Sequence, residues 1–341
     1  MSIVYFLGAG ATKAVAPDSP LGNELIPLIM ENVDLLNRFP SEVKKIKEFI
    51  NTTFHDTKHY PGIEDILSYL DFNINEKVAL TSKYNFEDLI NLKNTLIKII
   101  GKMLEEYLNK LDNTTTDIFA KKITNYDTVI STNYDIVIDN ALLTQKKIIE
   151  YGVRYRKNIF PTPISDGRNG IRATGCDAKL PISPSDSKIM LLKLHGSLNW
   201  LYCPKCDEYD ITVGEKGAVK YVEENLLCYN HYCTSKYQYL IVTPTYFKEY
   251  ENRIIKTIWK QARTSIANAD KIVFIGYSLP EADKEIRCMI LNGLNDSKIK
   301  PGIIVVGKKN SNSLTKERYM RLFGEVDYRP IGFVDYVNTK M

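Results

Sequence analysis

Residues 3–12 read Ile-Val-Tyr-Phe-Leu-Gly-Ala-Gly-Ala-Thr, an apolar run that ends in a glycine-rich turn. Three later apolar runs end in a similar way, in the small or polar loops Ser131-Thr132-Asn133-Tyr134-Asp135, His195-Gly196-Ser197 and Gly276-Tyr277-Ser278. Because the carboxyl ends of parallel strands line the ligand crevice of an open α/β sheet, we expect these loops to converge on one site. The pattern favours an enzyme that uses a nucleotide cofactor.

Length and composition describe a globular protein with a full core. The chain has 341 residues, of which 44% are hydrophobic and 25% are charged. Its net charge of +4, from 45 basic and 41 acidic residues, gives no strong signal for nucleic acid as a partner. No apolar run reaches the ~20 residues of a membrane-spanning helix. The apolar start lacks the basic segment of a signal peptide, so we expect a cytoplasmic protein with no membrane partner.

Strand and helix patterns alternate after residue 124, which predicts an α/β fold with a doubly wound parallel sheet. Expected strands cover residues 3–7, 128–130, 190–194, 239–242, 272–275 and 303–306. Expected helices in this part cover residues 134–143, 254–267 and 281–291, with Cys288 in the core. Residues 157–188 are rich in Pro, Gly, Ser and Asp, and we expect a loop there that covers a cofactor.

A helical insertion is predicted over residues 20–123, because helix-like spacing replaces strand patterns there. The two flanking parts, residues 1–19 and 124–341, form the α/β domain in this interpretation. Within the insertion, Leu89, Leu92, Leu96 and Ile99 form an apolar stripe. One interpretation is packing inside the chain, and the other is an interface that forms a homo-oligomer.

The cysteines give the most specific local signal. Cys203 and Cys206 form a C-x₂-C pair, and Cys228 and Cys233 follow some twenty residues later. This spacing is typical of a structural Zn²⁺ site with four thiolate ligands, in a small module over about residues 200–236. His231 stands at the two-residue spacing from Cys228, so the fourth ligand is either Cys233, which we prefer, or His231.

The polar loops supply the candidate catalytic residues. His195 follows an apolar strand and precedes a glycine, and an imidazole titrates near neutral pH, where a general base works best. The alternative is a structural histidine that binds a backbone group. Asn133 and Asp135 can orient a ribose hydroxyl or a water molecule, whereas the alternative for Asp135 is a helix cap. Ser278 offers a hydroxyl to a phosphate or ribose.

Taken in order, the glycine turn, Thr132-Asn133-Tyr134-Asp135, His195-Gly196-Ser197, the cysteine pairs and Gly276-Tyr277-Ser278 resemble the sirtuin superfamily. The resemblance implies a Rossmann-like domain that binds NAD and a small zinc-ribbon module. It implies that His195 is the catalytic base, acting with Asn133. The residues it assigns to the cofactor are Gly8, Ala9, Gly10, Thr12, Asn133, Asp135, Gly276 and Ser278.

Departures from the deacylating sirtuins narrow the expected activity. The loop after Gly10 has no Pro-Asp-Phe-Arg equivalent, and Thr243-Pro244-Thr245-Tyr246-Phe247 stands where acyl-peptide pairing would be expected. The chain looks more like divergent sirtuin-like proteins of bacterial antiphage systems, which hydrolyse NAD to nicotinamide and ADP-ribose. An NAD-dependent lysine deacylase is the alternative, and a nucleotide sensor without turnover is the third. We expect gating by oligomerisation or by a partner such as an ATP-driven translocase of the HerA type.

Overall fold

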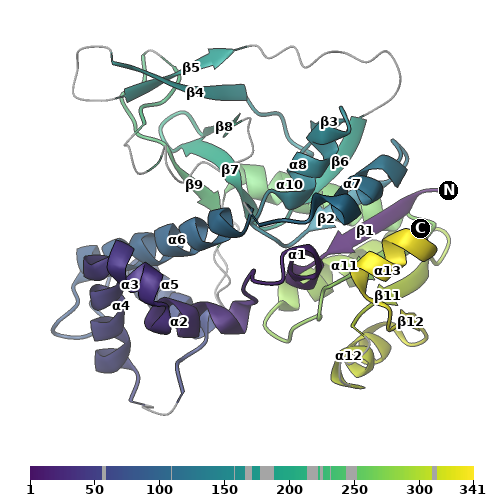
Figure 1. Cartoon of the computed structure of the whole chain (residues 1–341), viewed down its shortest axis with the longest axis horizontal. Helices are drawn as coiled ribbons and strands as arrows, with labels where there is room; N and C mark the ends of the chain where they lie inside the picture. The colour runs from purple at the N-terminus through teal and green to yellow at the C-terminus, as the bar shows by residue number, and fades with distance from the viewer. Residues whose placement is uncertain are drawn as a thin grey trace. The chain divides into compact units, whose positions relative to one another are not determined.

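The chain folds into two compact units (Figure 1). The first contains Met1–Pro17, Leu108–Ile241 and Tyr250–Met341, and the second is built mainly from Asp18–Tyr107. A computed structural model describes residues 1–55, 59–108, 110–156, 158–165, 171–176, 188–212, 222, 226–230, 232–242, 252–308 and 313–341.

The first unit contains a sheet of seven parallel strands in the order β12-β11-β10-β1-β2-β6-β3. The strands are β1 (Ile3–Leu7), β2 (Thr128–Ser131), β3 (Ile148–Glu150), β6 (Lys188–Lys193), β10 (Lys271–Ile275), β11 (Gly302–Val306) and β12 (Asp327–Arg329). The central strands are almost wholly buried, as near-continuous apolar runs in a parallel sheet require. The structure thus confirms the expected parallel α/β sheet.

The strand order reverses between β1 and β10. The strands β2, β6 and β3 lie on one side of β1, whereas β10, β11 and β12, which come later in the chain, lie on the other. In open α/β sheets, ligands bind beyond the carboxyl ends of the strands at such a reversal. The turn after β1 and the loop after β10 therefore occupy the position at which a nucleotide site is expected.

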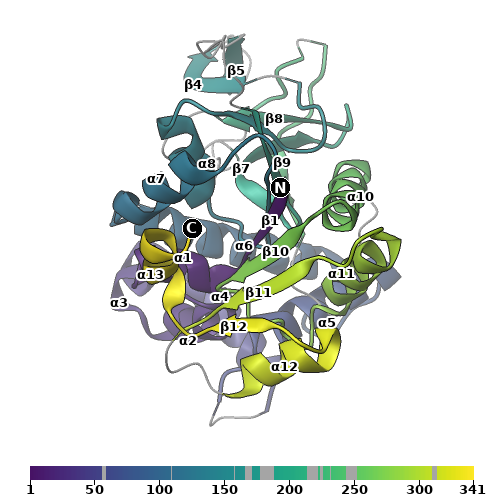
Figure 2. The ribbon, with the colours of Figure 1, turned by 90° about the vertical axis from the view of Figure 1, so that its right-hand side faces the viewer.

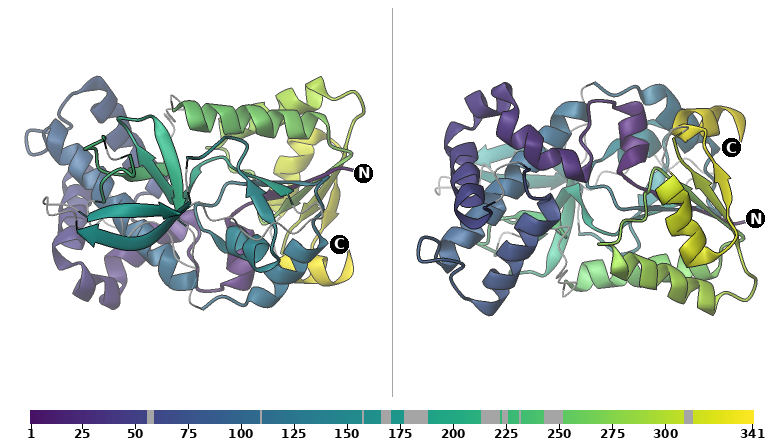
Figure 3. Two further views of the ribbon diagram at one scale, coloured as in Figure 1. Left: turned by 90° about the horizontal axis from the view of Figure 1, so that it is seen from above. Right: turned by 90° about the horizontal axis from the view of Figure 1, so that it is seen from below.

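Helices cover both faces of this sheet (Figures 2 and 3). One group consists of α1 (Ala9–Val15), α7 (Asn113–Lys122), α8 (Val137–Thr144) and α13 (Gly332–Thr339), and the other contains α10 (Arg253–Ala267) and α11 (Lys284–Asp296). A further helix, α12 (Ser313–Phe323), packs Tyr319 against Phe274 of β10. Cys288 is exposed on α11, so its expected place in the core is wrong: the helix buries Ile286 and Met289 instead.

A second sheet in the first unit has the order β5-β4-β8-β7-β9. Its strands are β4 (Asn158–Ser165), β5 (Ile171–Cys176), β7 (Gly196–Cys203), β8 (Glu208–Thr212) and β9 (Gln238–Ile241). The loop expected over residues 157–188 is wrong where β4 and β5 pair with each other in antiparallel fashion and at Lys188, which begins β6. The remainder of the expected loop lies outside the described residues. The strand expected at residues 239–242 is present as β9, but it pairs antiparallel with β7 rather than joining the large sheet.

The second unit is helical. Its helices are α2 (Gly22–Glu31), α3 (Val33–Arg38), α4 (Pro40–Thr53), α5 (Ile63–Glu76) and α6 (Phe86–Leu108). The apolar stripe Leu89, Leu92, Leu96 and Ile99 of α6 is buried in the common core of these helices. The stripe therefore packs within the chain and gives no support to a homo-oligomer, which stays a prediction. In the described part of the chain, no helix combines the length and apolar character needed to cross a membrane.

The helix α7 belongs to the first unit, although the sequence placed residues 113–122 in the helical insertion. It packs against α8 and α13. Its N-terminus is capped by Asp112, whose carboxylate accepts a hydrogen bond from the Thr114 amide at 3.0 Å. The helical unit thus ends before α7 begins.

Candidate functional site

The turn after β1 packs directly against the loop after β10. The Gly8 amide donates to the carbonyl oxygen of Ile275 at 3.0 Å, and the Gly10 amide donates to that of Gly276 at 2.9 Å. A Cβ on Gly8 would lie 2.6 Å from the Tyr277 Cα, and one on Gly10 would lie 2.8 Å from the Gly276 oxygen. Gly276 itself has a φ of +62°. Glycine is therefore required at all three positions by the packing of two backbones.

Three of the predicted site residues form a hydrogen-bonded group next to this turn. The Asn133 Nδ2 donates to the carbonyl oxygen of Gly8 and to the Thr12 Oγ1, both at 3.0 Å. The buried Thr12 hydroxyl donates in turn to Asp135 Oδ2 at 2.8 Å. The loop after β2 is thus fixed to the first turn of α1, which orients the Asn133 side chain.

Asp135 has two structural roles in this group. Its Oδ1 accepts a hydrogen bond from the Val137 amide at 3.0 Å, at the start of α8, while its Oδ2 accepts from Thr12. The carboxylate therefore fixes the backbone at the start of α8, close to the helix-cap role that was one of the two alternatives for Asp135, and it also anchors the Thr12 hydroxyl. A contact of Asp135 with a ribose stays a prediction.

His195 lies between β6 and β7, and it is buried. Its Nδ1 lies 3.2 Å from the carbonyl oxygen of Thr132. Because a carbonyl can only accept, Nδ1 carries the proton in this bond and the Nε2 lone pair is the basic position of the neutral ring. The following Gly196 has a φ of +79°, and a Cβ there would lie 1.8 Å from the Leu240 oxygen. The imidazole is thus held against the loop that carries Asn133, in the tautomer that a general base needs.

Two other predicted cofactor residues lie in the turn after β1 and in the loop after β10. Ala9 is exposed at the first position of α1, and Ser278 is exposed two residues after Gly276. The Tyr277 hydroxyl donates to Asp283 Oδ2 at 2.8 Å. Burial raises the pKa of this phenol well above its usual value, and the Asp283 carboxylate adds to the shift. The phenol therefore stays protonated and fixes the loop that presents Ser278.

Sequence reasoning missed a buried ion pair beneath the site. Lys193, the last residue of β6, lies with its Nζ 3.2 Å from Asp139 Oδ2 of α8, and both side chains are almost fully buried. The Lys193 ammonium also donates to the carbonyl oxygen of Asp135. The Tyr151 hydroxyl donates to Asp139 Oδ1 at 2.5 Å. The available signal was a lysine inside the apolar run Met-Leu-Leu-Lys-Leu at residues 190–194.

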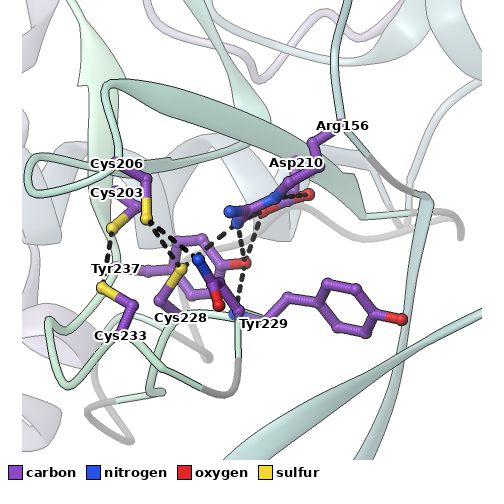
Figure 4. A network of polar contacts seen from close by, with 9 residues as sticks. Arg156, Cys203, Cys206, Asp210, Cys228, Tyr229, Cys233 and Tyr237 are labelled. Atoms are coloured by element: carbon purple, nitrogen blue, oxygen red, sulfur yellow. Dashed lines mark hydrogen bonds and ion pairs between the residues drawn. The ribbon is translucent and has the colours of Figure 1, made fainter.

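The four cysteines of the predicted metal site come together in the first unit (Figure 4). Their sulfur atoms all lie within 4.8 Å of one another, with 3.6 Å between Cys203 and Cys233 and 3.8 Å between Cys206 and Cys228. Tetrahedral Zn²⁺ with Zn–S bonds of ~2.3 Å places its sulfur ligands about 3.8 Å apart. The four residues therefore fit a Zn²⁺ ion, with Cys233 in the ligand set. His231, the alternative ligand, lies outside the described residues.

A charged network supports this cluster (Figure 4). The Arg156 Nη2 lies 3.2 Å from Cys228 Sγ and 3.2 Å from the Tyr237 hydroxyl, and the guanidinium forms an ion pair with the fully buried Asp210. Burial raises the pKa of the Cys228 thiol to about 12, and Arg156 opposes this shift. A bound cation would offset the remaining free-energy cost of ionising the Cys228 thiol, because a metal deprotonates the thiol that coordinates it.

The cysteine cluster is separate from the histidine. His195 directly precedes β7, whereas Cys203 is the last residue of that eight-residue strand. At ~3.3 Å per residue, the eight residues from His195 to Cys203 span up to about 26 Å. A metal ion held by four thiolates also has no open coordination position for a substrate. The arrangement is that of a structural metal site.

Residues 127–331 match the model of the SIR2-like domain, which is more than half of the chain. The chain belongs to the SIR2-like family. The SIR2-like match includes Asn133, His195, the four cysteines and Gly276, whereas the turn at residues 8–12 precedes it. No curated protein has a sequence that matches this chain significantly. Membership of the SIR2-like family supports an NAD-related activity of the sirtuin type.

Proposed function

We propose that the chain is an NAD glycohydrolase, which cleaves NAD to nicotinamide and ADP-ribose in a bacterial antiphage system. The observation that carries the proposal is the fixed tautomer of His195 beside the Asn133 loop, which is itself bonded to the turn after β1 at the reversal of the strand order. We further propose that the activity is gated by assembly or by a partner such as a HerA-type translocase, since unregulated NAD loss would harm the host cell.

In the proposed reaction, the bond between C1′ of the ribose and the nicotinamide nitrogen breaks, and its electron pair leaves with nicotinamide. The ribose passes through an oxocarbenium-like state, and the oxygen of a water molecule adds to C1′. His195 accepts the proton that this water loses, directly or through a ribose hydroxyl. Asn133, with its amide nitrogen bound to Gly8 and Thr12, has its Oδ1 available to orient the water.

The decisive experiment measures nicotinamide release from NAD by the purified 341-residue chain. His195→Ala and Asn133→Ala are each expected to lower the rate by on the order of a hundredfold or more, with the melting temperature and metal content retained. Asn133→Asp, which keeps the size of the side chain, separates the loss of the amide from the loss of volume. His55→Ala is the matched control, because His55 is an exposed histidine of the second unit.

Addition of an acetylated peptide separates the proposal from its alternatives. Hydrolysis predicts that the peptide leaves nicotinamide release unchanged. Nicotinamide release that depends on the peptide would instead indicate that the chain is a deacylase. Binding of NAD with no turnover in any oligomeric state or with candidate partners would contradict the proposal and assign a sensor.

A further inference from the structure

Lys193 and Asp139 form an ion pair in the interior of the first unit. The exposed fractions of their side chains are 2% and 1%, and the Lys193 Nζ lies 3.2 Å from Asp139 Oδ2. The pair joins the carboxyl end of β6 to the first turn of α8. Lys193 precedes His195 by two residues and is bonded to the Asp135 carbonyl, so the pair lies next to the predicted site.

Stability alone does not explain such a pair. Removal of two charges from water is costly, and apolar side chains of similar volume often serve the fold equally well or better. The neighbours of Lys193 along β6 are apolar, so an apolar residue would fit the pattern of this strand. Buried charges that persist against this cost are retained in some proteins because they fix one specific arrangement.

The contacts of the ammonium identify the arrangement that is fixed. The Lys193 Nζ donates to the main-chain oxygen of Asp135, which belongs to the loop between β2 and α8. The side chains of that loop hold Thr12: Asn133 donates to its hydroxyl, and Asp135 accepts from it. The bond to Lys193 thus determines where the backbone between Asn133 and α8 lies.

The carboxylate of Asp139 is itself held on its other oxygen. The Tyr151 hydroxyl donates to Asp139 Oδ1 at 2.5 Å, and the Asn199 Nδ2 lies 3.4 Å from that hydroxyl. Residues from the end of β3 and from β7 therefore complete the network. Both oxygens of the Asp139 carboxylate are hydrogen-bonded, so the carboxylate has a fixed position. It therefore holds the Lys193 ammonium in one place.

We propose that Lys193 and Asp139 are positioning residues for the Asn133 loop. The ammonium holds the Asp135 carbonyl, and Asp139 holds the ammonium, so the loop that carries Asn133 stays against His195 when NAD is bound. The proposal deepens the NAD hydrolase function and rests on it. The alternative is that the pair only fastens α8 to β6.

Charge-free replacement of the pair distinguishes these roles. The variant Lys193→Met/Asp139→Asn keeps the volume of both side chains closely and leaves no unpaired charge, so a merely structural pair predicts wild-type behaviour once the melting temperature is retained. A positioning role predicts a kcat for nicotinamide release at least tenfold lower, with a smaller change in KM. It also predicts at least tenfold faster hydrogen exchange in residues 132–137, with no change in β10.

A matched control comes from the second unit, where Lys93 and Asp71 form an ion pair at 2.5 Å with exposed fractions of 29% and 8%. The variant Lys93→Met/Asp71→Asn is expected to leave kcat and the exchange of residues 132–137 unchanged. If the double variant of Lys193 and Asp139 does not fold, the single variants Lys193→Met and Asp139→Asn distinguish the two roles. Asp139→Asn retains the ammonium on the Asp135 carbonyl and should exchange more slowly in the loop than Lys193→Met.

The exchange measurement is independent of NAD turnover. Faster loop exchange in the double variant, with a wild type that stays inactive in every oligomeric state and with candidate partners, would support the positioning role and contradict the hydrolase function. Wild-type exchange together with wild-type kcat in the double variant would overturn the positioning role alone. Equal loop exchange in the two single variants would also overturn it, because the effect would then follow from losing the ion pair rather than from losing the bond to Asp135.

Discussion

Replacement of Gly10 by alanine reverses the effect that helix propensity predicts. Gly10 is the second residue of α1, and an interior helical Gly→Ala change normally stabilises by about 1 kcal/mol. A Cβ at Gly10 would, however, lie 2.8 Å from the carbonyl oxygen of Gly276 and 2.9 Å from its Cα. Both neighbours are backbone atoms, so no change of rotamer relieves the contact.

The size of the effect follows from these contacts. The two loops must move apart, which overpacks their surroundings at a cost of about 1–3 kcal/mol. The same movement weakens the 2.9 Å hydrogen bond from the Gly10 amide to Gly276, at a cost of about 1 kcal/mol. After subtraction of the propensity gain, the free energy of unfolding should fall by about 1–3 kcal/mol. For a unit of this size, the melting temperature should fall by about 2–12 °C.

Urea and thermal unfolding of Gly10→Ala, followed by circular dichroism, measure this change. The control is Gly302→Ala at the start of β11, where the nearest neighbour of a Cβ is the Lys271 Cγ at 3.7 Å. The control should stay within about 0.5 kcal/mol of wild type. A Gly10→Ala protein as stable as wild type, or more stable, would refute the steric argument.

Three further predictions concern the metal cluster and the Asn133 group. Purified protein should contain close to one zinc per chain, and Cys203→Ser should lose that zinc and destabilise the fold, as metal analysis and thermal unfolding will show. Arg156→Met should release zinc to a chelator about tenfold faster or more, because a partner of a thiolate ligand is lost, whereas the exposed Arg263→Met should not. Thr12→Val removes the hydroxyl between Asn133 and Asp135 and should cost about 1–3 kcal/mol in urea unfolding; no loss would contradict the role of that hydroxyl.

The parallel sheet was predictable because each of its central strands carries its own local signal. Residues 3–7, 128–130 and 272–275 are short apolar runs that end in small or polar residues, and burial on both faces explains that pattern. The cysteine cluster was predictable for a similar reason, since the geometry of a tetrahedral site constrains the spacing of its ligands.

The second sheet depends on pairing that short patterns do not encode. Residues 157–188, which include β4 and β5, are rich in Pro, Gly, Ser and Asp, so local composition predicts a loop, but the two strands pair with each other. The pairing of Lys193 with Asp139 joins residues 54 positions apart, and only the packing of α8 on the sheet brings them together. In both cases the partner is distant in the sequence, so a local pattern does not reveal the contact.

Packing accounts for the glycines at the reversal of the strand order without any ligand. Gly8, Gly10 and Gly276 are required because two backbones meet there, so a chain with no cofactor would need them equally. Asn133 and His195 are different, because an apolar side chain could occupy the buried position of His195 at a smaller desolvation cost. The chemical case for NAD cleavage therefore rests on these two residues. Their substitution, and not that of the glycines, is the informative test of activity.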